Sequence, residues 1–379
     1  MNYRKYEIDE SPIKALRRCS RCVLPETMPF IEFDDDGVCN YCKTYRKREY
    51  IGEAAVRKMA DSIRRADGGC DSLVSFSGGR DSSYGMHYFV RELGLHPLAF
   101  SYDWGMVTDL AVRNQKLMCD KLGVKLVTVK ADIAKKRSNI RKNILAWLKS
   151  PDLGLIPLFM AGDKHYFYHA NRICKENGLS TILLASNPFE ETHFKSGFCG
   201  VRPKVLRTAE SISAIERLPL GDVLRMAAHY AWRFLGNPSF VNSSVWDTAA
   251  GAFSCYIVPH DYFRLFNYIP WNEAVVDRTL AEEYGWETSP ETKSTWRIGD
   301  GTSPFYNYIY YRLAGFTEND TLRSNQVREG MLTREQALEL VYRDNQPRFD
   351  GMKWYFDVVG LDMEDVLNKI CAMRPLYRA

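Results

Sequence analysis

The chain has 379 residues, 45% of them hydrophobic and 26% charged, so its composition is that of an ordinary globular protein with a sizeable core. This length predicts two domains, with room for an appended module. The net charge of +4 is too small to indicate a nucleic-acid-binding protein, and we expect no nucleic acid partner.

No apolar run approaches the roughly 20 residues that cross a bilayer, and the first residues contain no signal-peptide core. The sequence therefore predicts a protein with no membrane segment that stays in the cytoplasm. Ten cysteines in a reducing compartment indicate metal binding or catalysis rather than a disulfide framework.

Two C-x₂-C pairs form the first motif along the chain: Cys19, Cys22, Cys39 and Cys42. Their separation matches structural zinc sites, in which each pair places two thiolates on one tetrahedral ion. Residues 31–33 predict a strand that leads into a tight turn at Gly37. We interpret residues 1–50 as a zinc ribbon whose Zn²⁺ is structural, because four thiolates leave no open coordination position. An iron–sulfur cluster and four unrelated thiols are the alternatives.

Residues 51–66 predict a helix that joins this ribbon to the main domain. Beyond it, strands and helices alternate. The expected strands are 73–76, 98–102, 125–129 and 181–185. The expected helices are 82–93, 109–122, 133–148 and 164–177. Such alternation predicts an α/β fold with a doubly wound parallel sheet, which binds ligands at the carboxyl ends of its strands.

The first of these strands ends in a glycine-bearing loop that we interpret as a phosphate site. The loop residues are Ser77, Gly78, Gly79, Arg80, Asp81, Ser82 and Ser83. Two consecutive glycines let backbone N–H groups approach an anion, and the next helix adds the positive end of its dipole. Serine hydroxyls can donate to phosphate oxygens, and Asp81 is expected to contact Mg²⁺ beside them. The alternative is an ordinary turn in which Asp81 caps the helix.

Two further strand ends supply candidate site residues. After the second strand, Trp104 is placed to cover an adenine and Asp103 to reach ribose hydroxyls, unless the tryptophan simply packs on the sheet edge. After the fourth strand, residues 186–204 collect acidic and basic side chains between glycines. We expect Lys195 and Arg202 in this loop to hold acceptor or leaving phosphates, although solvated loops are commonly charged.

The signals beyond residue 205 are mostly structural. Residues 218–235 predict a helix whose aromatic side chains, Trp232 and Phe234, are interpreted as core. Residues 256–270 are aromatic and strand-like, and residues 333–336 form a capping box before another helix. Further helices are expected over 274–283, around 306–312 and over 360–370. We place a domain boundary near residue 205, which gives a nucleotide domain over 51–205 and a mainly helical acceptor- or partner-binding region over 206–379.

Four stretches carry a resemblance to a known family: C-x-x-C-V-L-P-E-T-M-P from Cys19, F-D-D-D-G-V-C-N-x-C from Phe33, S-G-G-R-D-S from Ser77 and M-L-T-R-E-Q-A from Met331. The S-G-G-R-D-S loop resembles the pyrophosphate loop (PP-loop) of the ATP pyrophosphatase superfamily, which implies an adenine nucleotide alpha-hydrolase-like fold. The whole set is similar to the N-acetyl sugar amidotransferases of bacterial surface-polysaccharide biosynthesis, including that of lipopolysaccharide O-antigen.

This resemblance implies an enzyme that converts the acetamido group of a nucleotide-linked sugar into an acetamidino group. It implies ATP and Mg²⁺ as cofactors, and ammonia supplied by a separate glutaminase subunit. The pyrophosphate and magnesium site carries over onto Ser77, Gly78, Gly79, Asp81 and Ser82, and the zinc site onto the four cysteines. The chain departs from the family after the fourth strand, where residues 185–188 read A-S-N-P in place of a glycine-and-acid loop.

Other functions remain open at this point. A PP-loop sulfurtransferase would use the same adenylation with sulfur as the nucleophile, and Cys199 is the candidate persulfide carrier. Other amide-forming adenylation is a third enzyme class. A non-enzymatic zinc-ribbon protein with a decayed nucleotide fold is the last alternative, and the intact glycine loop argues against it.

Overall fold

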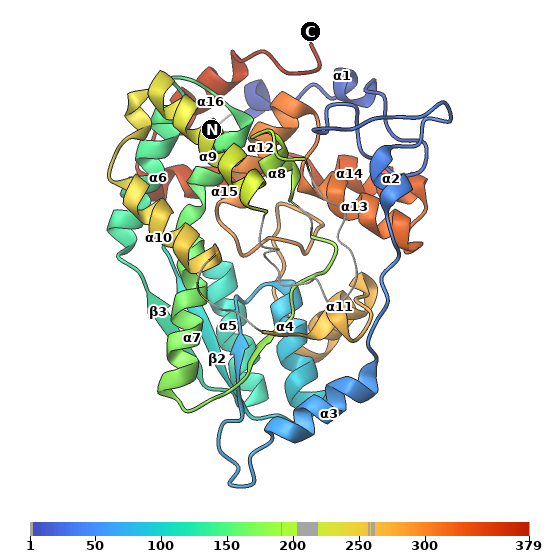
Figure 1. The fold of residues 1–379 in the computed structure, drawn as a ribbon, viewed down its shortest axis with the longest axis vertical. Helices are drawn as coiled ribbons and strands as arrows, with labels where there is room; N and C mark the ends of the chain where they lie inside the picture. The colour runs from blue at the N-terminus through green and yellow to red at the C-terminus, as the bar shows by residue number, and fades with distance from the viewer. Residues whose placement is uncertain (1–2, 191, 203–218, 257, 259–261, 379) are drawn as a thin grey trace.

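The computed structural model describes residues 3–190, 192–202, 219–256, 258 and 262–378 (Figure 1). In this part of the chain, one sheet contains five parallel strands in the order β3-β2-β1-β4-β5. The strands are β1 (Ser72–Ser75), β2 (Pro97–Asp103), β3 (Leu126–Lys130), β4 (Ile182–Leu184) and β5 (Phe263–Arg264). The first four are those expected from the sequence, and the prediction of an α/β protein with a parallel sheet is confirmed.

The edge strand β5 comes from the far side of the predicted domain boundary. Phe263 lies opposite Leu183 of β4 in parallel register. The boundary near residue 205 itself falls on residues 203–218, outside the described residues. Of the longer strand expected over 256–270, the described residues contain only β5, because Leu265–Asn267 already forms a 3₁₀-helix (η7). Residues 257 and 259–261 lie outside the described residues.

Helices lie on both faces of the sheet (Figure 1). Successive residues of a strand point to opposite faces, so Leu73 packs in one core cluster with Ile144, and Val74 in the other with Met86. The helices of this region are α3 (Glu53–Ile63), α4 (Arg80–His87), α5 (Asp109–Leu122), α6 (Ile133–Trp147) and α7 (Tyr166–Glu176). A π-helical turn, η2 (Tyr88–Glu92), continues α4, and two 3₁₀ segments, η3 (Leu153–Phe159) and η4 (Ala161–His165), precede α7.

The bounds of α5 are as predicted. Helix α4 begins earlier than expected, at Arg80, and its N-cap is Gly79. The alternative in which Asp81 caps this helix is therefore wrong, because Asp81 already lies inside the first turn.

The N-terminal segment contains little regular structure apart from short helices: η1 (Tyr3–Tyr6), α1 (Ser11–Lys14) and α2 (Asn40–Thr44). The expected strand over 31–33 is reduced to a single antiparallel bridge between Phe33 and Cys39. The expected turn is present, with Gly37 at φ +75°, a backbone conformation that favours glycine.

The C-terminal region is mainly helical, as predicted. Its helices are α9 (Leu220–Gly236), η6 (Pro238–Phe240), α10 (Ser244–Tyr256), α11 (Glu273–Thr279), η8 (Leu280–Tyr284), α12 (Ser303–Ala314), α13 (Glu318–Glu329), α14 (Arg334–Asp344), α15 (Phe349–Val359) and α16 (Met363–Cys371). The capping box before α14 is confirmed, with Thr333 and Gln336 bonding reciprocally. Helices α10, α13 and α15 were not expected.

The interpretation of Trp232 as a core residue is wrong. Its side chain is 73% exposed on α9. Phe234 does pack inward, stacked against Phe240 with ring centroids 5.2 Å apart. No helix in the described part of the chain combines the length and the apolarity needed to cross a bilayer.

Candidate functional site

The strand order places a topological switch point between β1 and β4. The chain leaves β1 toward β2 on one side and reaches β4 on the other. In open parallel sheets, ligands bind in the crevice outside the carboxyl ends of the strands at such a point. The loop from Ser77 to Ser83 follows β1, and the loop that contains Glu190 follows β4, so both lie at this edge.

Glycine is required at position 78 for two reasons. Gly78 has φ +77°, and a Cβ there would lie 2.4 Å from the carbonyl oxygen of Ala111 in α5. The loop is closed by its own serines: the Oγ atoms of Ser77 and Ser82 lie 3.0 Å apart, and Ser77 Oγ accepts the N–H of Gly79. The loop therefore has a fixed shape that fits tightly against α5.

The first turn of α4 has the features of an anion site. Its N-cap, Gly79, provides no side-chain acceptor for the N–H groups of this turn. The hydroxyl of Ser83 is buried and has no hydrogen-bond partner among the described residues. An oxyanion bound at this helix start would accept hydrogen bonds from these N–H groups.

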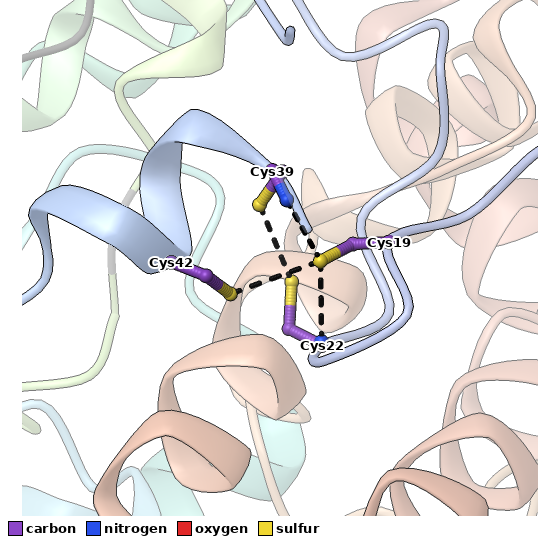
Figure 2. Close-up of side chains that lie close together, drawn as sticks. All are labelled: Cys19, Cys22, Cys39 and Cys42. Carbon is purple, nitrogen blue, oxygen red and sulfur yellow. Dashed lines mark hydrogen bonds between the residues drawn. The ribbon is translucent and has the colours of Figure 1, made fainter. Parts of the chain in front are cut away.

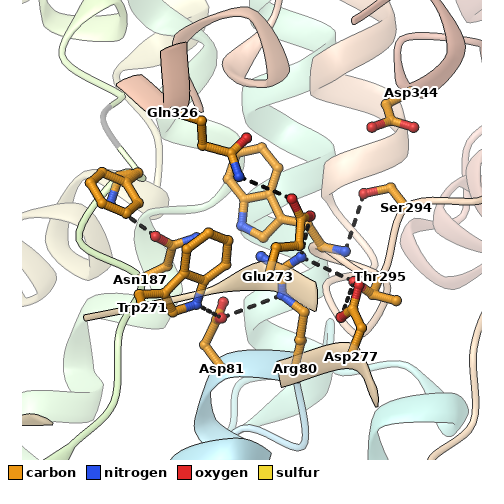
Figure 3. Close-up of polar contacts among 12 residues, drawn as sticks. Arg80, Asp81, Asn187, Trp271, Glu273, Asp277, Ser294, Thr295, Gln326 and Asp344 are labelled. Atoms are coloured by element: carbon orange, nitrogen blue, oxygen red, sulfur yellow. Dashed lines mark hydrogen bonds and ion pairs between the residues drawn. The ribbon is translucent and has the colours of Figure 1, made fainter. Parts of the chain in front are cut away.

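The structure places the predicted ligand residues Arg80 and Asp81 in a buried polar network (Figure 3). Asp81 Oδ1 accepts the indole N–H of Trp271 at 2.7 Å and lies 3.3 Å from Arg80 Nε. Arg80 is 2% exposed, and its Nη1 donates to Glu273 at 2.8 Å and to Thr295 at 3.0 Å. Arg80 therefore holds the start of α4 in place, and its positive charge is paired with carboxylates inside the protein.

Glu273 joins this network to α13. Its carboxylate accepts from Arg323 and, at 3.0 Å, from Gln326. Burial alone would raise the pKa of Glu273, but Arg323 and Arg80 outweigh it and lower the pKa to about 2. Arg323 also donates to Asp344 at 3.0 Å. Ion pairs thus connect the glycine loop to the C-terminal helices.

A second buried cluster surrounds Glu318, the first residue of α13. Lys195, in the short helix α8 (Phe194–Gly197), places its Nζ 3.3 Å from Glu318 Oε2 and 4.2 Å from the ring centre of Tyr306. Arg297 Nε lies 3.0 Å from Glu318 Oε1. Burial lowers the pKa of Lys195, although Glu318 opposes the shift. The predicted site residue Lys195 is thus at the centre of a charged cluster.

Glu190 links the two clusters. Its carboxylate accepts from the indole of Trp296 and lies 3.6 Å from Arg297 Nη2. Burial raises the pKa of Glu190 to about 7; Arg297 opposes this shift and the negative charge of Asp81 adds to it. This carboxyl group can therefore accept and release a proton near neutral pH.

A small cavity of about 30 Å³ lies beside this second cluster. Its lining includes Trp296, Arg297, Asn307 and Glu318. This volume admits one or two molecules of the size of water. Arg297 has φ +51°, a conformation uncommon outside glycine, so the backbone holds its side chain there under strain.

The other predicted site residues lie elsewhere. Arg202 is exposed and pairs with Glu32 at 3.2 Å, so the structure does not bring it to Lys195. Asp103 Oδ1 accepts the N–H of Gly105 at the end of β2. Trp104 is 8% exposed and packs against Gly162. This agrees with the alternative in which the tryptophan packs on the sheet edge.

The four cysteines of the N-terminal motif converge in the structure (Figure 2). Their Sγ atoms all lie within 4.8 Å of one another, with Cys22 and Cys39 at 3.8 Å and Cys19 and Cys42 at 3.9 Å. Four sulfurs bound tetrahedrally to Zn²⁺ at 2.3 Å are separated by about 3.8 Å. The cluster therefore fits a single zinc-sized ion, whereas an iron–sulfur cluster distributes its four thiolates over two or four irons and spreads them further.

Two arginines from the C-terminal region close over this cluster. Arg328 of α13 donates to the sulfurs of Cys22 and Cys42, each at 3.3 Å. Arg334 donates to the carbonyl oxygens of Cys19 and Cys22. A zinc ion with four thiolates carries a net charge of −2, so a buried guanidinium beside it offsets part of that charge.

Cys199 has the environment of a packed thiol. It is 4% exposed, and its Sγ donates to the carbonyl oxygen of Gly154 at 3.3 Å. Burial raises the pKa of this thiol to about 12, with Asp152 adding to the shift. A persulfide carrier needs an accessible thiolate, which this environment disfavours.

Sequence reasoning missed most of the residues contributed by α13. The sequence of this helix, ENDTLRSNQVRE, is almost entirely polar, yet ten of its residues are buried: Glu318, Asn319, Asp320, Thr321, Leu322, Arg323, Ser324, Asn325, Gln326 and Arg328. An all-polar helix normally predicts a solvated surface. The run of paired acids, amides and arginines was the only signal that these side chains satisfy one another inside the protein.

A scan against protein-family models finds no matching family, and a search of curated proteins finds no significant match. The class that the structure defines is an α/β protein with a parallel five-stranded sheet and a buried four-cysteine cluster. Any functional assignment within this class depends on the residues of the chain itself.

Proposed function

We propose that this protein is an ATP-dependent amidotransferase of the PP-loop type. In this proposal it adenylates an amide oxygen, that of the acetamido group of a nucleotide-linked sugar, and replaces this oxygen with ammonia. The observation that carries the proposal is the loop after β1, in which Gly78 is wedged against α5 and the helix start at Gly79 has no side-chain cap.

The reaction follows from the chemistry of an amide. Its oxygen is a poor leaving group, so it first attacks the α-phosphorus of ATP, and the bond to the β-phosphate breaks. Ammonia then adds to the carbon, the C–O bond breaks, and AMP leaves with the former amide oxygen. The products are an amidine, AMP and pyrophosphate, and one proton is released from the attacking nitrogen.

The protein's tasks are binding, orientation and proton transfer. The loop from Ser77 to Ser83 holds the departing pyrophosphate by N–H and hydroxyl donors. Asp81 would hold Mg²⁺, which would supply positive charge to that leaving group. Because Asp81 is already bonded to Trp271 and Arg80, the direction of its carboxylate is fixed.

Glu190 is suited to take the proton from the attacking nitrogen. Its carboxyl group has a pKa near 7 because it is buried, and it lies at the same sheet edge as the loop. The nearby cavity of about 30 Å³ admits ammonia but excludes a sugar. Lys195 and Arg297, which both pair with Glu318, are the cations we assign to an acceptor phosphate.

The test is to measure AMP and pyrophosphate release from ATP with a panel of nucleotide-linked acetamido sugars and ammonium chloride. We expect release that depends on both the acceptor and ammonium, and loss of it in Ser82→Ala. Ser62→Ala, an exposed serine of α3, is the matched control. Formation of ADP and orthophosphate, or release that a sulfur donor but not ammonium supports, would contradict the proposal.

A further inference from the structure

Helices α9 and α10 present an exposed apolar surface that no element of the described chain covers. Trp232 is 73% exposed and Trp246 80% exposed. We call the following residues the α9–α10 face: Leu220, Val223, Leu224, Trp232, Leu235, Val241, Trp246 and Phe253. Single exposed apolar side chains are ordinary, but eight large ones within two helices and the segment between them indicate an interaction surface.

The pattern along α9 is that of a helix with two apolar sides. Leu220, Leu224 and Leu235 share its outer side, since residues spaced by about 3.6 lie on one side of a helix. Its inner side packs through Phe234, which stacks on Tyr230 and Phe240. Because the inner contacts already hold the helix in place, the outer leucines and tryptophan are not needed for its packing.

The carboxylates near this face are each paired with a basic side chain. Asp222 lies 3.3 Å from Arg225, and Asp152 lies 3.1 Å from His229. Asp247 bonds to Lys136. The α9–α10 face therefore has little net negative charge of its own.

Helix α6 borders the face and is strongly basic. Its sequence, IAKKRSNIRKNILAW, contains five basic residues and no acidic residue, and four of the five remain when Lys136, buried and paired with Asp247, is set aside. Lys142 donates a hydrogen bond to Ser243 at 2.7 Å. Lys149, just after α6, donates one to Ser239, also at 2.7 Å. Both ammonium groups therefore lie beside the segment between α9 and α10. Figure 1 shows α6, α9 and α10 together on one flank of the molecule.

We propose that this flank docks onto an anionic lipid surface. Exposed tryptophans and leucines enter the boundary between headgroups and acyl chains, while lysines and arginines beside them pair with anionic headgroups. The proposal is independent of the ATP chemistry, because none of these residues belongs to the glycine loop or to the Glu318 cluster.

The positive charge of α6 favours an anionic lipid surface over a second copy of the chain as the binding partner. A symmetric dimer through the α9–α10 face would bring the basic side chains of two α6 helices toward each other, and like charges across an interface are unfavourable. An anionic bilayer complements the same charges. It also fits a surface in which tryptophan, the residue of membrane interfaces, is the most exposed type.

The experiment is vesicle flotation of the full-length protein. We expect it to float with vesicles that contain phosphatidylglycerol, and to float much less with pure phosphatidylcholine. Raising the salt concentration should weaken the binding, because screening removes the electrostatic part. No flotation with anionic vesicles, or equal binding to both lipids, would overturn the proposal.

Variants of exposed residues separate the apolar from the electrostatic contribution to vesicle binding. Trp232→Ala and Trp246→Ala should each weaken partitioning about tenfold. Lys142→Gln and Lys149→Gln should each weaken it about fivefold, on anionic vesicles only. Matched controls lie on the opposite part of the fold, in and beside α3: Ile51→Ala, which is 53% exposed, and Lys58→Gln should change partitioning by less than about twofold.

Light scattering of the same proteins tests the alternative that the α9–α10 face binds a second copy of the chain. If the native protein is a dimer that Trp232→Ala converts to a monomer, and neither binds vesicles, the face joins two copies and the proposal is wrong. We expect one molecular mass for all variants and binding that follows the lipid charge.

Discussion

Arg328 donates a hydrogen bond to the sulfur of Cys22 over 3.3 Å, although 306 residues separate the two in the chain. The same guanidinium reaches Cys42 through its Nε. The four-cysteine cluster is therefore completed by α13, and the N-terminal segment is fastened to the C-terminal region at the place where a metal ion would add its own bonds.

Replacing Arg328 should weaken this connection. In Arg328→Gln the buried sulfur atoms lose a charged donor, and we expect a loss of about 3 kcal/mol in the free energy of unfolding. Urea denaturation measures the loss, and metal analysis measures the zinc content, expected to be one ion per chain in the native protein. Arg21→Gln, an exposed arginine between the first two cysteines, should leave both unchanged. Equal stability of the two variants would show that the contact is unimportant.

Removing the metal should separate the same segment from the fold. Because a zinc site of four thiolates holds its loops together only when the ion is bound, a strong chelator should lower the unfolding midpoint and expose the segment that contains Cys39 to proteolysis. Mass spectrometry of the fragments checks this. A chelated protein with unchanged proteolysis would contradict a structural metal.

Gly78→Ala should abolish pyrophosphate release. The new Cβ would lie 2.4 Å from the carbonyl oxygen of Ala111, and φ +77° is itself strained for alanine. We expect a loss of activity of about 100-fold or more, since a misplacement near 1 Å is sufficient for that. Gly123→Ala is the control, because Gly123 has a similar φ of +67° but open space around it. Retained activity in Gly78→Ala would rule out the loop as the pyrophosphate site.

The raised pKa of Glu190 predicts how the activity depends on pH. Its pKa of about 7 means that the carboxylate needed as a base forms as the pH rises through 7, so activity should increase over that range. Glu190→Gln should reduce activity about 100-fold or more and remove this rise. Rate measurements from pH 5 to 9 at saturating ammonium test this. A rise that persists in Glu190→Gln would assign the titration to another group.

Cys199→Ser should retain most of the activity. The thiol is buried, its pKa is raised to about 12, and ammonia transfer needs no sulfur carrier. Loss of activity in a variant whose unfolding midpoint is unchanged would instead favour sulfur transfer through Cys199.

The sequence predicted the sheet and the cysteine cluster because their signals are local. The apolar runs of β1 to β4, the bounds of α5 and the C-x₂-C spacing all depend on neighbouring residues. The loop at Gly78 was also visible, but its tight contact with Ala111 was not.

Polar burial was the part that the sequence could not show. In α13 the residues that face the core are acids, amides and arginines, and their partners, such as Glu273 and Lys195, come from distant segments. The prediction for Trp232 was wrong for the opposite reason. Its apolar side chain indicated burial, whereas the structure exposes it. Both errors concern what a helix is packed against, which hydrophobic periodicity does not encode.

The closing of the cysteine cluster by Arg328 has a consequence for biosynthesis. During translation the thiols of Cys19 to Cys42 leave the ribosome long before Arg328, which follows Cys42 by 286 positions. The nascent chain therefore offers an open set of thiols for most of its synthesis, and a metal ion bound there would be enclosed only after α13 is complete. A shortage of zinc would act on the unfinished polypeptide, before the mature protein exists to bind it.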